Sequence, residues 1–296
     1  MGKRATEGES GQATPEWLGL ILLVSLLMLS MAALGIAIPG LAVGEAIASK
    51  LVCAAGLGDG CGEPETPLDA AYGDDVAGLV AARAPELRYE DGMHSLPVDF
   101  RRCRQESCAD GPQSGEVGRS FDGESVTAFT HVVDCRGEEP DPAYDCSGDR
   151  AGSVYVHYFL YWPTSATSKA LFGDLGYHDD DWEGFQIRVD PRGTTDARAS
   201  SHHGYNYGGG PTNWLSDAGV THRSAWGKNL GTYDISGGSH AGHVDDDAGR
   251  GGRFTPGNRI NLVPLESLSE NDRATKFAIT PPWTKPVYDD PEDEGT

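Results

Sequence analysis

The stretch Val154-Tyr155-Val156-His157-Tyr158-Phe159-Leu160-Tyr161-Trp162 decides the fold class of this chain. Most of its residues are aromatic or β-branched, and such side chains favour the extended backbone of a β-strand. Pro163 follows directly. Because proline cannot donate a hydrogen bond within a sheet, we expect the strand to end there.

A second strand is expected at residues 182–189. Alternation along a strand places Glu183, Phe185 and Ile187 on one face, and the Phe185 side is the expected core. Glu183 stands at the start of this strand, where it is expected to face a cavity. Shorter strands, separated by Gly-rich turns, are expected at residues 86–89, 126–133, 197–205, 231–236 and 259–263, and a helix at residues 69–82.

Many short strands joined by such turns predict a mainly β protein with an antiparallel β-sandwich ectodomain. One N-terminal transmembrane helix is also expected, because residues 17–38 are apolar and uncharged. A helix of this length rises about 1.5 Å per residue and spans a hydrocarbon core of roughly 30 Å. Lys3 and Arg4 precede the helix, so the sequence predicts a single-pass cell-membrane protein whose bulk is extracytoplasmic. Removal of a signal peptide after Ala48 is the alternative.

The expected organisation has six parts. Residues 1–16 are a cytoplasmic leader, 17–38 the transmembrane helix, 39–67 a tether, 68–150 a cysteine-containing region, 151–289 the β-sandwich core, and 290–296 a frayed acidic tail. The cysteine count is even, and the pattern in an exported chain predicts disulfides between Cys53, Cys61, Cys103, Cys108, Cys135 and Cys146. Six cysteines allow fifteen pairings, of which sequential local pairing is our expectation.

The stretch Gly11-Gln12-Ala13-Thr14-Pro15-Glu16-Trp17-Leu18-Gly19-Leu20 resembles the start of type IV prepilin-like proteins, especially the tight-adherence (TadE- or Flp-like) minor pilins. In that family a peptidase cuts after a Gly, and a Glu stands five residues beyond the cut. Gly11 and Glu16 have this spacing. The resemblance implies processing at Gly11 and a structural role as a minor subunit of a pilus-like assembly.

Charge excludes one class of partner. The chain has 45 acidic and 23 basic residues and a formal net charge of −22. Nucleic acids bind basic surfaces, so we expect no nucleic-acid partner.

An acidic motif, Gly176-Tyr177-His178-Asp179-Asp180-Asp181-Trp182-Glu183, precedes and begins the second strand. Asp181 and Glu183 share a face on an extended backbone, and His178 is expected to fold back from the preceding loop. Oxygen donors with one imidazole suit calcium, magnesium or manganese, so the candidate metal ligands are His178, Asp180, Asp181 and Glu183. His203, His240 and Asp174 are candidates for an additional ligand or, for the histidines, a general base. A solvated turn without a cation is the alternative.

Two further resemblances rest on this motif. Tyr161-Trp162-Pro163 followed by the acidic motif resembles the necrosis-inducing (NLP) cytolysins, which carry Tyr-x-Pro and then Gly-His-x-x-Asp-Trp-Glu. Asp181-Trp182-Glu183 together with Gly238-Ser239-His240-Ala241 resembles a vacuolar protein sorting-associated family that shares an Asp-Trp-Glu and Gly-Ser-His-Ala pattern.

The cytolysin resemblance implies a β-sandwich that holds a divalent cation and engages membrane glycolipids. It implies His178, Asp181 and Glu183 as ligands. Ser165 stands where that family has a further Asp, and Asp174 or Asp180 is the expected substitute.

The function expected from the sequence is divalent-cation-dependent binding of a glycan or lipid by a membrane-anchored extracytoplasmic β domain. Two alternatives stay open. One is a metal-assisted hydrolase of an envelope or extracellular polymer, with His203 or His240 as general base. The other is a minor pilin-like subunit that does no chemistry. Apart from these two candidates for a general base in the hydrolase alternative, the catalytic residues stay unknown.

Overall fold

The computed structural model describes residues 65–293, except residues 92, 94, 112–117, 138–139, 166–176, 202–203, 207–225, 245–253 and 258. Within this part the chain is mainly β and forms two mixed sheets. Several expectations from the sequence concern residues outside this part of the chain. They are those for Gly11, Glu16, residues 17–38, most of the tether, Cys53, Cys61, Asp174 and His203.

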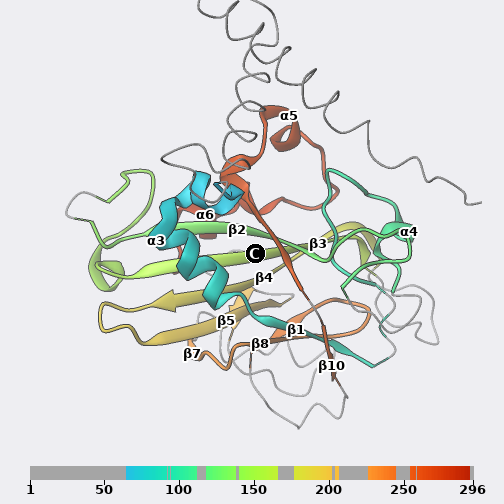
Figure 1. Cartoon of the computed structure of the whole chain (residues 1–296), viewed down its shortest axis with the longest axis horizontal. Helices are drawn as coiled ribbons and strands as arrows, with labels where there is room; N and C mark the ends of the chain where they lie inside the picture. Colours follow the sequence, from blue (N-terminus) through green and yellow to red (C-terminus); the bar gives the residue numbers. More distant parts are fainter. Residues whose placement is uncertain are drawn as a thin grey trace, which may run out of the picture. The chain divides into compact units, whose positions relative to one another are not determined.

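The larger sheet has the strand order β11-β2-β3-β4-β5-β6, with β7 pairing to β5, and the smaller sheet has the order β10-β1-β8-β9. Figure 1 shows helix α3 lying across the strands of the larger sheet. The elements are α3 (Pro67–Arg83), β1 (Glu86–Glu90), α4 (Glu106–Ala109), β2 (Thr127–Asp134), η1 (Gly148–Arg150), β3 (Val154–Ser165), β4 (His178–Val189), β5 (Thr195–Ser201), β6 (Gly204–Asn206), β7 (Gly227–Lys228), β8 (Thr232–Ile235), β9 (Gly242–His243), β10 (Phe254–Pro256), β11 (Asn261–Pro264), η4 (Leu265–Ser267), α5 (Glu270–Arg273), η5 (Pro282–Thr284) and α6 (Pro286–Asp289).

The centre of the larger sheet is the antiparallel ladder between β3 and β4, which runs from Val154↔Val189 to Ser165↔His178. Almost every residue of β3 is buried. Its alternate residues therefore belong to separate apolar clusters on the two faces of the sheet.

On the first face, Val156, Tyr158, Leu160 and Trp162 pack with residues of the smaller sheet such as Tyr233. Helix α3 covers the same cluster through its partly buried apolar side chains. On the opposite face, Phe159 and Tyr161 pack with Trp182, and Phe277 and Trp283 of the carboxyl-terminal region cover them. Trp283 thus packs on the face of the sheet opposite helix α3.

Helix α3 confirms the helix expected at residues 69–82. Thr66 caps its first turn, because the Thr66 hydroxyl accepts a hydrogen bond from the Asp69 amide while the Asp69 carboxylate accepts from the Thr66 amide. Pro67 occupies the start of the helix, where no N–H is required.

Two strand boundaries differ from the prediction. Strand β3 continues through Pro163 to Ser165, and β4 begins at His178 instead of residue 182. Pro163 lies beyond Leu160, the last β3 residue to pair with β2, so its missing N–H leaves no gap in that ladder. The acidic motif is consequently part of a strand from His178 onwards, not a loop before it.

The predicted antiparallel arrangement is also wrong in part, because both sheets are mixed. Strand β1 pairs with β8 in parallel, and β2 pairs with β11 in parallel. Each of these pairs joins segments that are far apart in the sequence. Turn residues and local alternation indicate the direction of neighbouring hairpin strands, but they carry no information on such distant pairs.

The expectation of a transmembrane helix gains no support from the described chain. Across the residues whose structure is given, no helix combines the length and the apolar character that crossing a membrane requires.

Cysteines pair locally where the structure describes them. Cys103 and Cys108 have Cα atoms 5.9 Å apart, and those of Cys135 and Cys146 are 5.3 Å apart. Both distances lie in the usual range for a disulfide.

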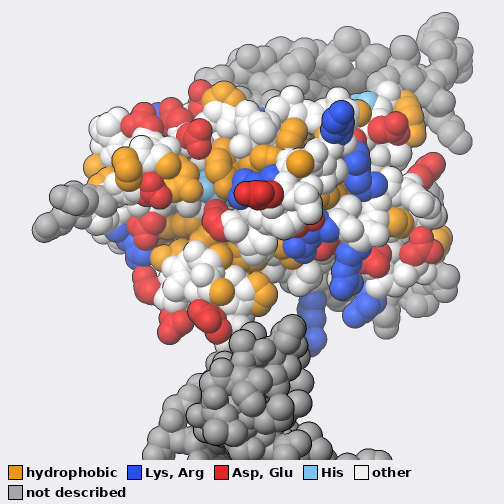
Figure 2. All heavy atoms as spheres, turned by 90° about the horizontal axis from the view of Figure 1, so that it is seen from above, with side chains coloured by type: hydrophobic (Ala, Val, Ile, Leu, Met, Phe, Trp, Pro, Cys, Tyr) orange, Lys and Arg blue, Asp and Glu red, His pale blue; other side chains and the backbone are white. Residues whose placement is uncertain are grey.

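Charges on the surface are mixed in spite of the strongly acidic composition. Figure 2 shows that Lys and Arg side chains gather on one half of the visible face, with acidic side chains beside them and on the other half. Several arginines there and elsewhere are paired, as in the contacts of Arg136 with Asp134 and of Arg150 with Asp290.

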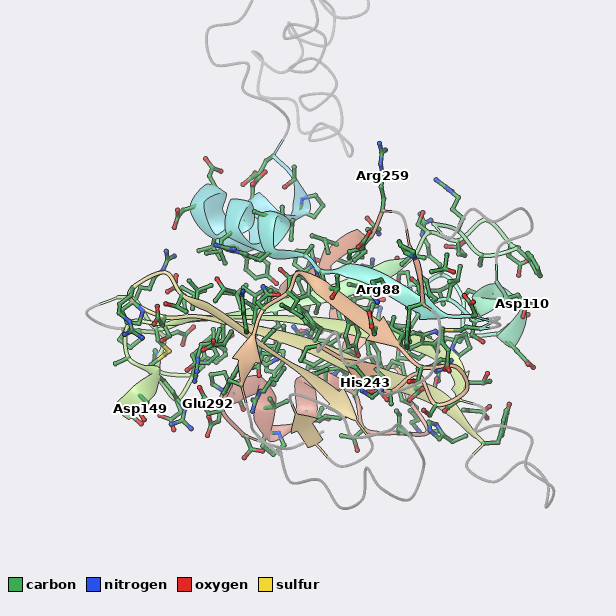
Figure 3. The ribbon with its side chains drawn as sticks, turned by 90° about the horizontal axis from the view of Figure 1, so that it is seen from below. Arg88, Asp110, Asp149, His243, Arg259 and Glu292 are labelled. Atoms are coloured by element: carbon green, nitrogen blue, oxygen red, sulfur yellow. A yellow bond between two sulfur atoms is a disulfide. The ribbon has the colours of Figure 1, made fainter. Side chains whose placement is uncertain are left out.

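The segment 290–293 is bound to the larger sheet, although we expected a frayed tail. The guanidinium of Arg198, which is fully buried in β5, donates to the carbonyl oxygens of Pro291 (2.6 Å) and Asp293 (3.1 Å). Glu292 accepts hydrogen bonds from Tyr155 and from Trp226. In Figure 3, Glu292 lies on the side of the sheet opposite Arg88. The segment therefore closes the second face.

Arg198→Ala is expected to lower the free energy of unfolding by about 3 kcal/mol or more, because it removes the guanidinium hydrogen bonds to the carbonyl oxygens of residues 291 and 293 and leaves the buried side-chain oxygen of Gln186 without its donor. Arg192→Ala is the matched control, since the side chain of Arg192 is 84 % exposed, and its effect is expected to stay within about 0.5 kcal/mol. Urea denaturation measures both values. Equal effects of the two substitutions would show that Arg198 does not hold the segment.

Candidate functional site

Polar side chains are buried together where β3 and β4 approach the loop between β8 and β9. Asp181 is 5 % exposed, Glu183 7 %, Ser200 4 % and His240 2 %, and Trp162 is fully buried beside them. We name these five residues the Asp181–His240 cluster. Buried ionisable groups are costly unless they are paired, so such a cluster is either a structural network or a functional site.

The centre of the cluster is a hydrogen bond between Asp181 Oδ2 and His240 Nδ1, 2.7 Å long. The indole of Trp162 stacks on the imidazole, with ring centroids 4.3 Å apart and planes 5° apart. A carboxylate beside Nδ1 selects the tautomer in which Nδ1 carries the proton. The stacking fixes the plane of the ring, and Nε2 is left as the basic atom of His240.

Glu183 lies on the same face of β4 as Asp181, since they pair with Leu160 and Trp162 of β3. Burial raises the pKa of Glu183 well above its usual range, and the negative charge of Asp181 raises it further. The Ser200 hydroxyl, which donates to Glu183 Oε2 at 2.6 Å, and the charge of Lys285 act in the opposite direction. Glu183 therefore keeps its proton to a higher pH than an exposed glutamate does.

Two backbone conformations at the cluster are unusual. In the described part of the chain, Asp180 (φ 56°) and His240 (φ 55°) are the only residues other than glycine with positive φ. Side chains disfavour this region, and such strain persists only where the surrounding structure enforces it. Both residues lie at the central hydrogen bond. His240 is one of its two partners, and Asp180 is the chain neighbour of the other partner, Asp181.

Asp180 is held from the opposite face of the sheet. Its carboxylate accepts hydrogen bonds from the guanidinium of Arg104 (2.5 Å), the hydroxyl of Tyr161 (2.6 Å) and the amide of Ala278 (2.7 Å). Burial disfavours its charge, but the bonds from Tyr161 and Arg104 outweigh this and lower the pKa of Asp180. These contacts anchor the start of β4 and keep Asp181 in position.

More exposed residues lie at the start of β4. The side chain of His178 is 39 % exposed, and its Nε2 lies 4.0 Å from Asp181 Oδ1. Tyr177 is 51 % exposed, although its hydroxyl contacts the Asp179 carboxylate. The imidazole at the first residue of β4 thus lies near Asp181, and an exposed aromatic ring directly precedes it in the chain.

The predicted calcium, magnesium or manganese site is wrong for the described chain. No group of three or more His, Cys, Asp or Glu side chains is arranged to hold a metal ion anywhere in the described ranges. The candidate ligands have other roles: Asp180 faces away from the cluster toward Arg104, Asp181 binds His240, and Glu183 binds Ser200. Of the additional candidates, the structure brings His240 into the cluster, whereas Asp174 and His203 lie outside the described residues.

Sequence reasoning missed several members of this site. Ser200 and Arg104 are ordinary surface residue types with no motif around them, so nothing in the sequence marks them. Trp162 could have been found, because the register of a β3–β4 hairpin places it opposite Asp181.

Comparison with known proteins does not assign a family. No family model matches the chain, and no curated protein matches it. One solved structure, described as "Toxin fold for microbial attack and plant defense", aligns with 69 % of this chain and 82 % of its own, at 18 % identity and a TM-score of 0.37. A likeness this distant supports no conclusion about this chain.

Glu183→Gln is expected to change how stability depends on pH. The folded-state pKa of Glu183 is raised, so its contribution is fully present below about pH 4.5, its usual pKa, and is lost as pH rises through the folded-state pKa. The glutamine side chain does not titrate, so the variant lacks this loss of stability. The difference in free energy of unfolding between Glu183→Gln and the natural protein should therefore grow in favour of the variant above about pH 4.5, by up to about 1.4 kcal/mol per pH unit.

Denaturant unfolding of both proteins at a series of pH values measures this difference. Glu86→Gln, at an exposed position in β1, is the control and should follow the natural protein. A constant difference between Glu183→Gln and the natural protein at all pH values would contradict the raised pKa.

Proposed function

We propose that the described domain binds a hydroxyl-rich ligand, a glycan or the sugar-bearing head group of a lipid, at the Asp181–His240 cluster. The observation that carries this proposal is the strained backbone at Asp180 and His240 around a buried Asp–His pair. Strain of this kind collects at ligand clamps and active sites, and buried groups with shifted pKa values collect there as well. A purely structural network has no need of two strained residues at one pair.

The chemistry of the cluster fits sugar hydroxyls, which both donate and accept hydrogen bonds. Asp181 supplies an acceptor, protonated Glu183 a donor, and Nε2 of His240 an acceptor. Tyr177 offers an exposed ring for the apolar face of a sugar. This combination of an aromatic surface with a few fixed polar groups is typical of small-ligand sites, and it needs no metal.

Asp181→Asn is expected to weaken ligand binding by about tenfold or more, because the neutral amide no longer fixes the tautomer of His240 by a charged hydrogen bond. Asp122→Asn is the matched control at an exposed turn and should bind like the natural protein. A glycan array and vesicles that carry glycolipids measure the binding. Equal binding by Asp181→Asn and Asp122→Asn would refute a site at the cluster.

A second candidate function is acid–base hydrolysis of an envelope or extracellular polymer. The observation that favours it is the raised pKa of Glu183 next to a histidine whose Nδ1 is held by Asp181. A carboxylic acid that keeps its proton and an imidazole with a basic nitrogen can act together as general acid and general base. Here Nε2 of His240 would take a proton from water and Glu183 would protonate the leaving oxygen.

Glu183→Gln separates the two functions. If the site is hydrolytic, the variant should release products from cell-wall polysaccharide at least a hundredfold more slowly, in the usual range for loss of a general acid, while it still binds the polymer. Chromatography of the soluble products measures this rate. The hydrolase proposal fails if the natural protein releases no product from any polymer that it binds.

The pilin-like alternative depends on Gly11 and Glu16, which lie outside the described residues, and no observation on the described domain favours it.

A further inference from the structure

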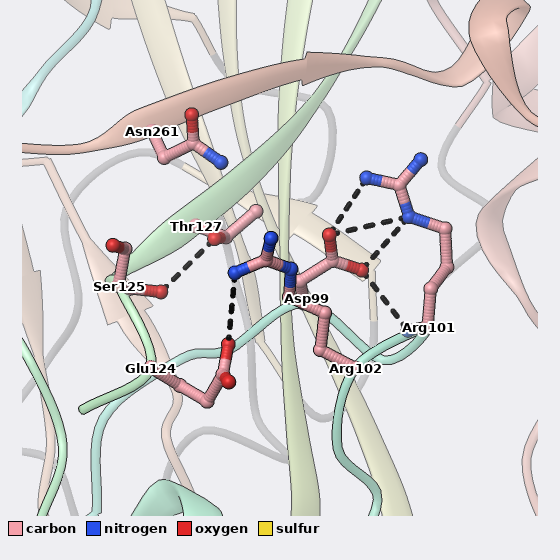
Figure 4. A pocket seen from close by; sticks show the side chains of 7 residues that line it. All are labelled: Asp99, Arg101, Arg102, Glu124, Ser125, Thr127 and Asn261. Atoms are coloured by element: carbon pink, nitrogen blue, oxygen red, sulfur yellow. Dashed lines mark hydrogen bonds and ion pairs between the residues drawn. The ribbon is translucent and has the colours of Figure 1, made fainter. Parts of the chain in front are cut away.

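A second polar cavity lies away from the Asp181–His240 cluster and shares no residue with it. Its volume is about 270 Å³, and it lies between residues 99–102, residues 124–127 and the start of β11. Figure 4 shows that Arg102, Thr127 and Asn261 extend into it, with Asp99 and Arg101 on one side and Glu124 on the other. The volume falls just below the range of about 300–1,000 Å³ that holds drug-sized ligands, so a smaller ligand fits.

One side of the cavity is fixed by an ion pair. Arg101 Nη2 lies 2.6 Å from Asp99 Oδ2, and Arg101 Nε lies 2.9 Å from Asp99 Oδ1. The Arg101 amide also donates to Asp99 Oδ1, and Asp99 is only 4 % exposed. A bidentate pair of this kind holds both side chains in one geometry. The Asp99 carboxylate accepts four hydrogen bonds from Arg101, about as many as a carboxylate can accept, whereas the Arg101 guanidinium uses only Nε and Nη2 and keeps donors for a ligand.

The other side is adaptable. Arg102 Nη1 lies 3.6 Å from Glu124 Oε2, and the Arg102 side chain is 69 % exposed. The Thr127 hydroxyl donates to the Ser125 carbonyl oxygen, so its lone pairs are presented as acceptors. Asn261 contributes an amide that both donates and accepts. Arg102 can therefore turn toward a ligand without breaking a strong contact.

The lining has no net charge, since two guanidinium groups balance two carboxylates. An anionic ligand would meet Asp99 and Glu124, and a cation would meet Arg101 and Arg102. A neutral ligand that donates to Glu124 and accepts from the two guanidinium groups meets no like-charge repulsion on either side. We propose that this cavity binds one neutral sugar ring or a polyol of similar size. This inference does not rest on the proposed function at the Asp181–His240 cluster.

Saturation-transfer NMR on the full chain tests the proposal, with glucose, galactose and mannose as probes and acetate and inorganic phosphate as anionic comparisons. At least one sugar is expected to bind with a dissociation constant on the order of 1 mM, as suits so small a ligand. Arg102→Gln should weaken that binding by about tenfold. Arg192→Gln is the control with the same change of charge at an exposed turn.

Asn261→Leu provides a second variant. Because the Arg102 side chain is exposed, Arg102→Gln is expected to fold like the natural protein. Asp181→Asn is measured in parallel. If sugar binding is lost in Asp181→Asn but retained in Arg102→Gln and Asn261→Leu, the cavity proposal is wrong while the proposed function stands. Absence of any sugar binding by the natural protein, or binding of the anions alone, would also overturn the proposal. Loss in Arg102→Gln and Asn261→Leu with binding retained in Asp181→Asn would support it.

Discussion

The rest of the described structure depends on the register of the β3–β4 ladder. Both faces of β3 are buried, so its alternate residues have to meet two different apolar surfaces. A slip by one residue would place Phe159 and Tyr161 where Leu160 and Trp162 now lie, and a sheet with two buried faces strongly disfavours such a slip. The same register places Asp181 opposite Trp162 and Glu183 opposite Leu160. The position of the site therefore follows from the packing of the core.

The start of β4 is held from both faces of the sheet. On one face Asp180 binds Arg104, Tyr161 and the Ala278 amide, and on the other Asp181 binds His240. Positive φ at Asp180 and at His240 accompanies these two contacts. A strained backbone costs of order 1–3 kcal/mol per residue and has to be stabilised by its surroundings. The buried charge-assisted hydrogen bonds of Asp180 and Asp181 offset that cost.

Local patterns predicted much of this fold. Aromatic and β-branched composition indicated β3, alternation placed Glu183 on the same face as Phe185, and the spacing of apolar residues indicated α3. Three features were beyond such patterns. The parallel pairs β1–β8 and β2–β11 join distant segments. Pro163 stays in a strand because no β2 residue pairs there. Arg198 binds segment 290–293, which composition alone marked as a frayed tail.

In the site, the acidic motif correctly indicated the position of the polar cluster but not its chemistry. Three adjacent aspartates suggested a cation, whereas the pleat of β4 sends Asp180 and Asp181 to opposite faces, and each finds a different partner.

The most direct test of a ligand site at the Asp181–His240 cluster is the state of the His240 ring. Long-range proton–nitrogen NMR spectra of the full chain report the protonation of each ring nitrogen. The signals of His240 are assigned as those that are missing from the spectrum of His240→Asn. For the neutral ring we predict a single tautomer with the proton on Nδ1, and a change in the Nε2 signal when a sugar or a glycolipid vesicle binds. An averaged mixture of tautomers, or ligand binding that leaves both ring nitrogens unchanged, would contradict the account.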